Sequence, residues 1–256
     1  MKERIISGAI ALIILLTVVL LGGVFVDAAI LILSLIGIYE MRNALRNIDI
    51  EINVWLCGLF SISTFIIAMT QSYSLRYEIL SIFVVLNALL FVFKQNYKMH
   101  DMLASIFVMY YVVFFMYHIA FMKGTLFVWF IFITAWASDT AAYFTGRFFG
   151  KHKLCPNLSP KKTIEGSIGG ILGSVIACLA FSVVFNITDL KFILTVAIFG
   201  SIFGQIGDLV ASKIKRTTQI KDYGKIMPGH GGVVDRFDSI LLTAPLTYFL
   251  FTLFIA

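Results

Sequence analysis

Charged residues are scarce in this chain. Asp, Glu, Lys and Arg make up 13 % of its 256 residues and 60 % are hydrophobic, whereas a soluble domain is about 25 % charged and about 45–50 % apolar. This composition excludes an ordinary soluble domain and predicts an integral membrane protein. The net charge of +6 would also suit a nucleic-acid binder. The basic residues, however, lie in short segments between apolar runs, as the positive-inside bias of membrane proteins predicts. We therefore expect no nucleic acid among the partners.

Several common catalytic motifs are absent as well. The chain has three cysteines, Cys57, Cys155 and Cys178, whose spacing suits neither a metal site nor a redox pair. No G-x-x-x-x-G-K-[ST] sequence is present, which excludes a Walker-type phosphate loop. The absence of G-x-S-x-G removes support for a serine nucleophile. The chemistry must therefore be sought among the few charged residues.

Long apolar runs predict the fold. A spanning helix needs about 20 mostly apolar residues, and we expect an all-α, polytopic membrane bundle of about nine such helices, the first one retained because no clear cleavage site follows it. The division between the first two helices is placed near Gly22-Gly23. The expected helices span residues Ile5–Leu21, Phe25–Tyr39, Val54–Thr70, Ile79–Phe93, Met102–Phe121, Leu126–Phe144, Ile164–Phe185, Leu190–Leu209 and Phe237–Ala256.

The basic residues predict the orientation. With a cytoplasmic N-terminus and alternating helices, the Lys and Arg residues fall on the cytoplasmic side except for Arg76, Lys123 and Lys191. Merging the first two helices would destroy this asymmetry. We expect a multi-pass protein of the cell membrane, with a transmembrane scaffold over residues 1–123. A catalytic region over 124–256 would carry its active site on the cytoplasmic side, where the longest basic segments lie.

The expected eighth helix carries a polar stripe. Residues three and four positions apart share a helical face, and here a carboxylate, hydroxyls and cations do so. Such a stripe suits a metal-bound, phosphorylated ligand, although an interhelical salt-bridge seam would have the same pattern. Its members are Ser201, Gln205, Asp208, Ser212, Lys215 and Arg216.

The ninth helix and the loop before it add further polar groups. The ninth helix should begin after Gly231-Gly232, ahead of its apolar span, so that Asp235 and Asp238 share a face. Asp235 then lies near the helix N-terminus, a position that can also stabilise an Asp with no metal. Asp208 and Asp235 match the oxygen ligands that Mg²⁺ prefers. The Gly-rich loop allows close approach of backbone N–H groups to an anion. His230 could bind phosphate, transfer a proton or be a turn residue.

Two earlier segments offer candidate residues. Asp139 lies in an apolar span and should face the bundle interior or water. Ser159 and Pro160 resemble a helix start, with Lys161 and Lys162 placed where an anion would bind. The G-x-x-x-G pairs of residues 166–173 are interpreted as packing. The acidic residues near span ends, Asp27, Asp49, Glu51 and Glu78, are expected to be solvated.

The segment from Ser212 to Asp238 resembles the signature of the phosphatidate cytidylyltransferases, also called CDP-diacylglycerol synthases. It reads Ser212-Lys-Ile-Lys-Arg216, Lys221-Asp-Tyr-Gly224 and Pro228-Gly-His-Gly-Gly-Val-Val-Asp-Arg-Phe-Asp238, and every fixed position matches. The similarity is close over residues 136–239 and only general over the first 120. Met227 stands where another apolar residue is usual, and Ala211 where many members have Glu.

The resemblance implies that CTP and phosphatidate react to give CDP-diacylglycerol and pyrophosphate. It implies Mg²⁺, with a second cation left open, and a homodimer. Asp208 and Asp235 would hold the metal and act in catalysis with Lys215 and Arg216. An alternative is another CTP-dependent lipid enzyme, a polyprenol kinase or an isoprenoid-ether-lipid cytidylyltransferase. The residues that would contact or support substrate are Ser212, Lys221, Asp222, His230, Gly231, Lys161, Lys162, Asp139 and Asp238.

Overall fold

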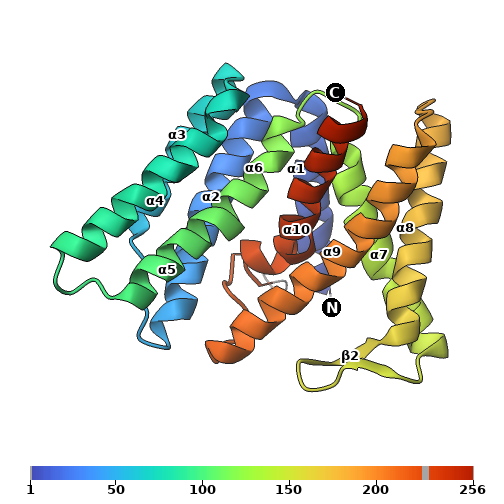
Figure 1. Cartoon of the computed structure of the whole chain (residues 1–256). Helices are drawn as coiled ribbons and strands as arrows, with labels where there is room; N and C mark the ends of the chain where they lie inside the picture. Colours follow the sequence, from blue (N-terminus) through green and yellow to red (C-terminus); the bar gives the residue numbers. More distant parts are fainter. Residues whose placement is uncertain (1, 227–230, 256) are drawn as a thin grey trace. The chain divides into compact units, whose positions relative to one another are not determined.

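The computed structural model describes residues 2–226 and 231–255. The chain divides into two compact units. The first comprises residues 1–124 and 217–236, and the second comprises residues 125–216 and 237–256. Both are built from helices (Figure 1).

The helices of the first unit follow one another with short connections. Gly22 and Gly23 both have positive φ, at 65° and 50°, and this turn ends the first helix and starts the second. The expected division is therefore confirmed at this point. The elements are α1 (Lys2–Leu21), α2 (Gly23–Arg46), α3 (Val54–Thr70), η1 (Tyr73–Leu75), α4 (Arg76–Phe93), α5 (Met99–Val108), η2 (Met109–Phe114) and α6 (Phe115–Phe121).

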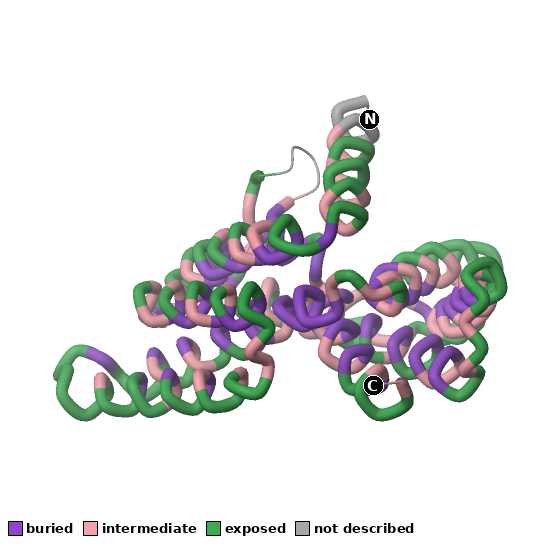
Figure 2. Tube along the Cα trace, turned by 90° about the horizontal axis from the view of Figure 1, so that it is seen from above, coloured by how far each residue is buried: buried purple, intermediate pink, exposed green. Residues whose placement is uncertain are grey.

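The core of the first unit is formed around the continuous helical run Met99–Phe121. This run contains a π-helical turn, η2, whose side chains are almost all buried. Helices α2 and α3 pack against η2 and α6. By contrast, residues 7–21 of α1 expose most of their apolar side chains, as the green stretches below the N label in Figure 2 show, which is typical of a helix that faces lipid.

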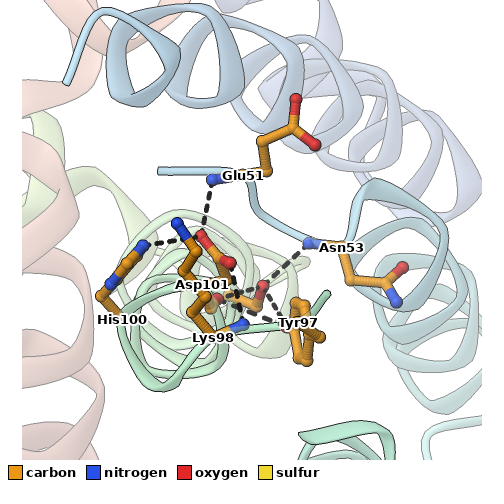
Figure 3. Close-up of polar contacts among 7 residues, drawn as sticks. Glu51, Asn53, Tyr97, Lys98, His100 and Asp101 are labelled. Carbon is orange, nitrogen blue, oxygen red and sulfur yellow. Dashed lines mark hydrogen bonds and ion pairs between the residues drawn. The ribbon is translucent and has the colours of Figure 1, made fainter. Parts of the chain in front are cut away.

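A polar cluster ties the segment between α2 and α3 to the start of α5 (Figure 3). Asp101 accepts hydrogen bonds from the backbone N–H groups of Glu51, at 2.8 Å, and Lys98, at 3.0 Å. The Ser105 hydroxyl accepts from Asn53 N at 2.8 Å and from the Tyr97 hydroxyl at 2.7 Å. Burial raises the pKa of Tyr97, so this phenol remains a hydrogen-bond donor.

The second unit contains the longest helix of the described chain. That helix is α9. The elements of the second unit are α7 (Val128–Phe149), β1 (Lys153–Cys155), β2 (Ser159–Thr163), α8 (Ile164–Val184), α9 (Leu190–Thr217) and α10 (Val233–Phe254). Thr217 and the first turn of α10 belong to the first unit. The strands β1 and β2 form an antiparallel hairpin. The apolar core gathers Phe130 of α7, Cys178 of α8, Val196 of α9 and Leu250 of α10.

Helices α7 and α8 lie side by side (Figure 1) and meet through glycines. A Cβ atom at Gly169 would lie 2.3 Å from Thr145 Oγ1, and one at Gly173 would lie 2.3 Å from Ala141 Cβ. Only residues without a side chain fit at these two contacts. The interpretation of the G-x-x-x-G pairs as packing is confirmed.

Two local expectations were wrong. Ser159 and Pro160 do not start a helix, because they lie in β2; α8 begins at Ile164, and Thr163 caps it by accepting a hydrogen bond from Gly166 N at 3.1 Å. Asp27 is not solvated. It is fully buried and pairs with Lys123, which also donates to Ala68 O at 2.7 Å.

Each expected span coincides with a helical segment, but fewer helices meet the length and hydropathy of a membrane crossing. Among the described residues, 6 helices do so: those within Gly23–Arg46, Tyr73–Phe93, Met99–Phe121, Ile164–Val184, Leu190–Thr217 and Val233–Phe254. Residues 7–21 and α3 are shorter apolar helices, and α7 is not among the six. The protein is thus an all-α, multi-pass membrane protein, and the count of nine spans stays a prediction.

Candidate active site

The polar stripe of α9 begins as an interhelical seam. Ser201 shares a hydrogen bond of 2.7 Å with Ser138 of α7. One turn later, Gln205 accepts from the Ser167 hydroxyl of α8 at 2.6 Å and donates to Ser167 O at 3.2 Å. This half of the stripe therefore joins α9 to α7 and α8 through hydrogen bonds between uncharged side chains.

The next turns of α9 carry the charged part of the stripe. Asp208 forms an ion pair with Lys162 of β2, and their side chains are 28 % and 26 % exposed. Ser212 donates to Asp208 Oδ1 at 3.4 Å. Lys215 is partly exposed and Arg216 is exposed. The β-hairpin thus brings a predicted phosphate ligand directly to a predicted metal ligand, at a place that water can reach.

Three carboxylates of the second unit lie close enough to interact. Asp238 of α10 interacts electrostatically with Asp208 of α9, with Asp139 of α7 and with the cation of Lys215. Ser239 donates its backbone N–H to Asp238 Oδ1 at 2.8 Å and its hydroxyl to Asp139 Oδ2 at 3.4 Å. Helices α9 and α10 can approach closely at this point because Gly207 has no side chain; a Cβ there would lie only 2.4 Å from Asp238 O. The structure therefore brings Asp139, Asp208, Asp238 and Lys215 together.

Asp235 lies in the first unit and is 6 % exposed. Its Oδ2 atom accepts from Tyr223 N at 2.8 Å and from Gly232 N at 3.0 Å. Gly231 has φ of +86°, and a Cβ there would lie 2.6 Å from Asp235 Oδ2. Lys221 and Asp222 are exposed in the same segment. His230 lies outside the described residues, as do Met227, Pro228 and Gly229.

Sequence reasoning missed one residue beside Asp235. Glu40 of α2 is 2 % exposed and accepts from Val233 N and Val234 N, each at 2.9 Å. The second span expected from the sequence ends at Tyr39, one residue before this carboxylate. An ionisable group at the end of an apolar run was the signal that could have found it, because such a group is rarely left without a function.

The donor set suits a hard cation. Within residues 2–226 and 231–255, no group of three or more His, Cys, Asp or Glu residues is placed to hold a metal ion. Mg²⁺ does not require such a group, since it commonly takes one or two carboxylates and completes its shell with water and substrate phosphates. The all-oxygen chemistry of the acidic residues fits this ion.

Known proteins resemble this chain over nearly its whole length. The model of the "Cytidylyltransferase family" matches residues 2–254. A phosphatidate cytidylyltransferase of Staphylococcus haemolyticus is 37 % identical over 260 residues, covering 96 % of this chain and 97 % of the relative. A protein of the same name from Bacillus subtilis is 31 % identical over 269 residues, covering 99 % and 98 %. With a helical membrane fold, the signature segment and matches of this extent, the chain belongs to the cytidylyltransferase family.

Proposed function

We propose that this protein converts CTP and phosphatidate into CDP-diacylglycerol and pyrophosphate. The observation that carries the proposal is the near-complete alignment with relatives named phosphatidate cytidylyltransferase, at 37 % and 31 % identity. The acidic and basic side chains at the ends of apolar helices support it, because one substrate is a lipid and the other a water-soluble triphosphate. A membrane enzyme with a water-accessible polar site meets both requirements.

The reaction needs positioning more than proton transfer. An oxygen of the phosphatidate phosphate attacks the α-phosphorus of CTP, and the bond from that phosphorus to the oxygen bridging to the β-phosphorus breaks. Pyrophosphate leaves with that electron pair. The nucleophile is already anionic, so no strong general base is required. The residues of the site must align two anions and offset their charge.

The cations of the site are suited to this work. In the second unit, Lys215, Arg216 and the hydroxyl of Ser212 would contact substrate phosphates, with Lys161 and Lys162 of β2 supporting them. The first unit would supply further residues that contact or support the substrate: Lys221, Asp222, His230 and Gly231. Asp139 and Asp238 would orient these groups through hydrogen bonds and charge.

Asp208 and Asp235 would hold Mg²⁺, and a second cation could bind beside it. Bound there, the ion would neutralise charge on the triphosphate. Asp208 presents its carboxylate to Lys162, a cation that already offsets its charge. Asp235 is fixed by two backbone donors on one oxygen. We further propose the cell membrane as the location, a site open to the cytoplasm, and a homodimer.

The test uses the purified protein in detergent with phosphatidate and CTP labelled in either the α- or the γ-phosphate. We expect label from α-phosphate to enter the lipid, and label from γ-phosphate to enter pyrophosphate. EDTA should abolish both, and Mg²⁺ should restore them. Transfer of γ-label to a lipid would indicate a kinase, and the absence of labelled CDP-lipid under all conditions would refute the proposal.

A further inference from the structure

The residue that precedes α10 has no side chain that could cap the helix. Gly232 precedes the first helical residue, Val233, and the first backbone N–H groups of a helix have no partner within it. A Ser, Thr, Asp or Asn at this position would normally accept from them. Here Glu40 does so from another helix: its Oε1 atom accepts from Val233 N and its Oε2 atom from Val234 N, each at 2.9 Å.

The glycines of this segment leave the space that Glu40 fills. A Cβ at Gly232 would lie 2.2 Å from Glu40 Oε1, and one at Gly224 would lie 2.3 Å from the same atom. One turn earlier on α2, a Cβ at Gly37 would lie 2.7 Å from Val112 Cγ1 and 3.6 Å from Val234 Cγ2. The segment that contains Gly224 and Gly232 is therefore shaped around this one carboxylate.

Asp235 completes the same cap from within the helix. As the third helical residue, it reaches back to Gly232 N, as the acidic member of a capping box does, and it also accepts from Tyr223 N. Glu40 and Asp235 thus divide the donors of one helix start between them. Glu40 fixes the backbone from which the Asp235 side chain projects.

We propose that Glu40 is a positioning residue for the cytidylyl transfer, which sets the orientation of Asp235 without touching substrate. This role rests on the proposed function, since Asp235 matters to turnover only if the reaction occurs. It also changes the expectation for this helix start. Its donors are already engaged by two carboxylates, so the turn favours a cation or a cation-bound phosphate over a bare anion.

The first test is hydrogen exchange of the purified full-length protein. In Glu40→Ala, exchange should rise in peptides covering residues 231–236, because the Val233 and Val234 amides lose their acceptor. Glu40→Gln keeps one acceptor oxygen and should show a smaller rise. Glu78→Ala and Glu78→Gln are the matched controls, since Glu78 is an exposed glutamate of α4 in the same unit. A rise of equal size in α7 and α8 peptides would indicate general loss of structure and overturn the proposal.

The second test measures turnover. In Glu40→Ala, kcat should fall on the order of 10- to 100-fold, the usual cost of losing a group that orients a metal ligand, while the KM for phosphatidate stays unchanged. A rise in hydrogen exchange at residues 231–236 without a fall in kcat would overturn the positioning role. If the wild-type protein makes no CDP-lipid, the proposed function fails, whereas the exchange experiment still reports on the cap.

A rescue experiment separates the cap from mere loss of stability. Gly232→Ser should be inactive alone, because its Cβ would collide with Glu40. In the Glu40→Ala background this space is free, and the serine hydroxyl can cap α10 locally. The double variant should therefore be more active than either single variant. Additive losses would contradict the proposal.

Discussion

The ion pair of Lys162 and Asp208 gives the most direct test at the scale of single residues. Both side chains are partly exposed, so the pair adds little stability, about 0–1 kcal/mol. Lys162→Met should therefore leave the melting midpoint almost unchanged but lower kcat/KM on the order of 10-fold or more. Asp208→Asn should lower it further, because the proposed metal ligand itself is changed. Assays of purified variants with α-labelled CTP measure both effects.

Lys153→Met is the matched control for this prediction. Lys153 lies in β1 of the same hairpin and is exposed. Its replacement removes the same charge from the same strand pair without touching Asp208. Equal losses in Lys153→Met and Lys162→Met would show that the hairpin acts only through its overall charge, which would contradict a specific role for Lys162.

Individual residues also show how far the sequence could lead. Asp139, Asp208 and Asp238 were predicted from helical spacing and from the signature, and the structure brings them together. Glu40 and the buried pair of Asp27 and Lys123 were not predicted. Periodicity identifies which residues share one helix face, but it carries no information on which distant backbone group or charge lies opposite.

At the scale of elements, the α7–α8 contact depends on a missing side chain. Gly173→Ala should lower the thermal midpoint of the detergent-solubilised protein by several degrees, because the new Cβ would lie 2.3 Å from Ala141 Cβ and neither helix can yield easily. Ala141→Gly in the same chain should recover much of the loss. Size-exclusion profiles after heating measure the midpoint.

Gly58→Ala of α3 is the control for that substitution. The nearest atom to a Cβ at Gly58 is Leu35 Cδ2, at an ordinary contact distance of 3.9 Å. Ala is also a better helix former than Gly, by about 1 kcal/mol. This variant should be as stable as the wild type or more so. A similar loss in both variants would mean that close packing is not the reason for glycine in α8.

The elements differ in how well their sequence predicts them. Apolar runs located the helices, since burial or lipid contact of apolar residues sets their length. The β-hairpin was missed because Ser159-Pro160 is also a good helix start. Pro160 is compatible with β2 because each strand of a two-stranded hairpin is an edge strand and leaves backbone groups unpaired. Thr163 then supplies the cap that Ser159 was expected to provide.

For the whole molecule, the sequence pattern could not predict how the signature segment is divided. The structure groups residues 217–236 with residues 1–124. The contact of Glu40 with Val234 joins positions that are 194 residues apart. Such long-range pairs depend on the packing of complete helices, whereas motif spacing describes only neighbours along the chain.

The orientation in the membrane can be tested with a native residue. Cys57 and Cys178 are buried, whereas Cys155 of the β-hairpin is partly exposed. The distribution of Lys and Arg predicts a cytoplasmic hairpin. A membrane-impermeant maleimide should therefore label Cys155 in inside-out vesicles and not in intact cells, and Cys155→Ser should remove the signal. Thr188→Cys in that background, an exposed position between α8 and α9, should be labelled from the outside. The reverse pattern would place the site on the opposite face, where CTP is not supplied by the cell.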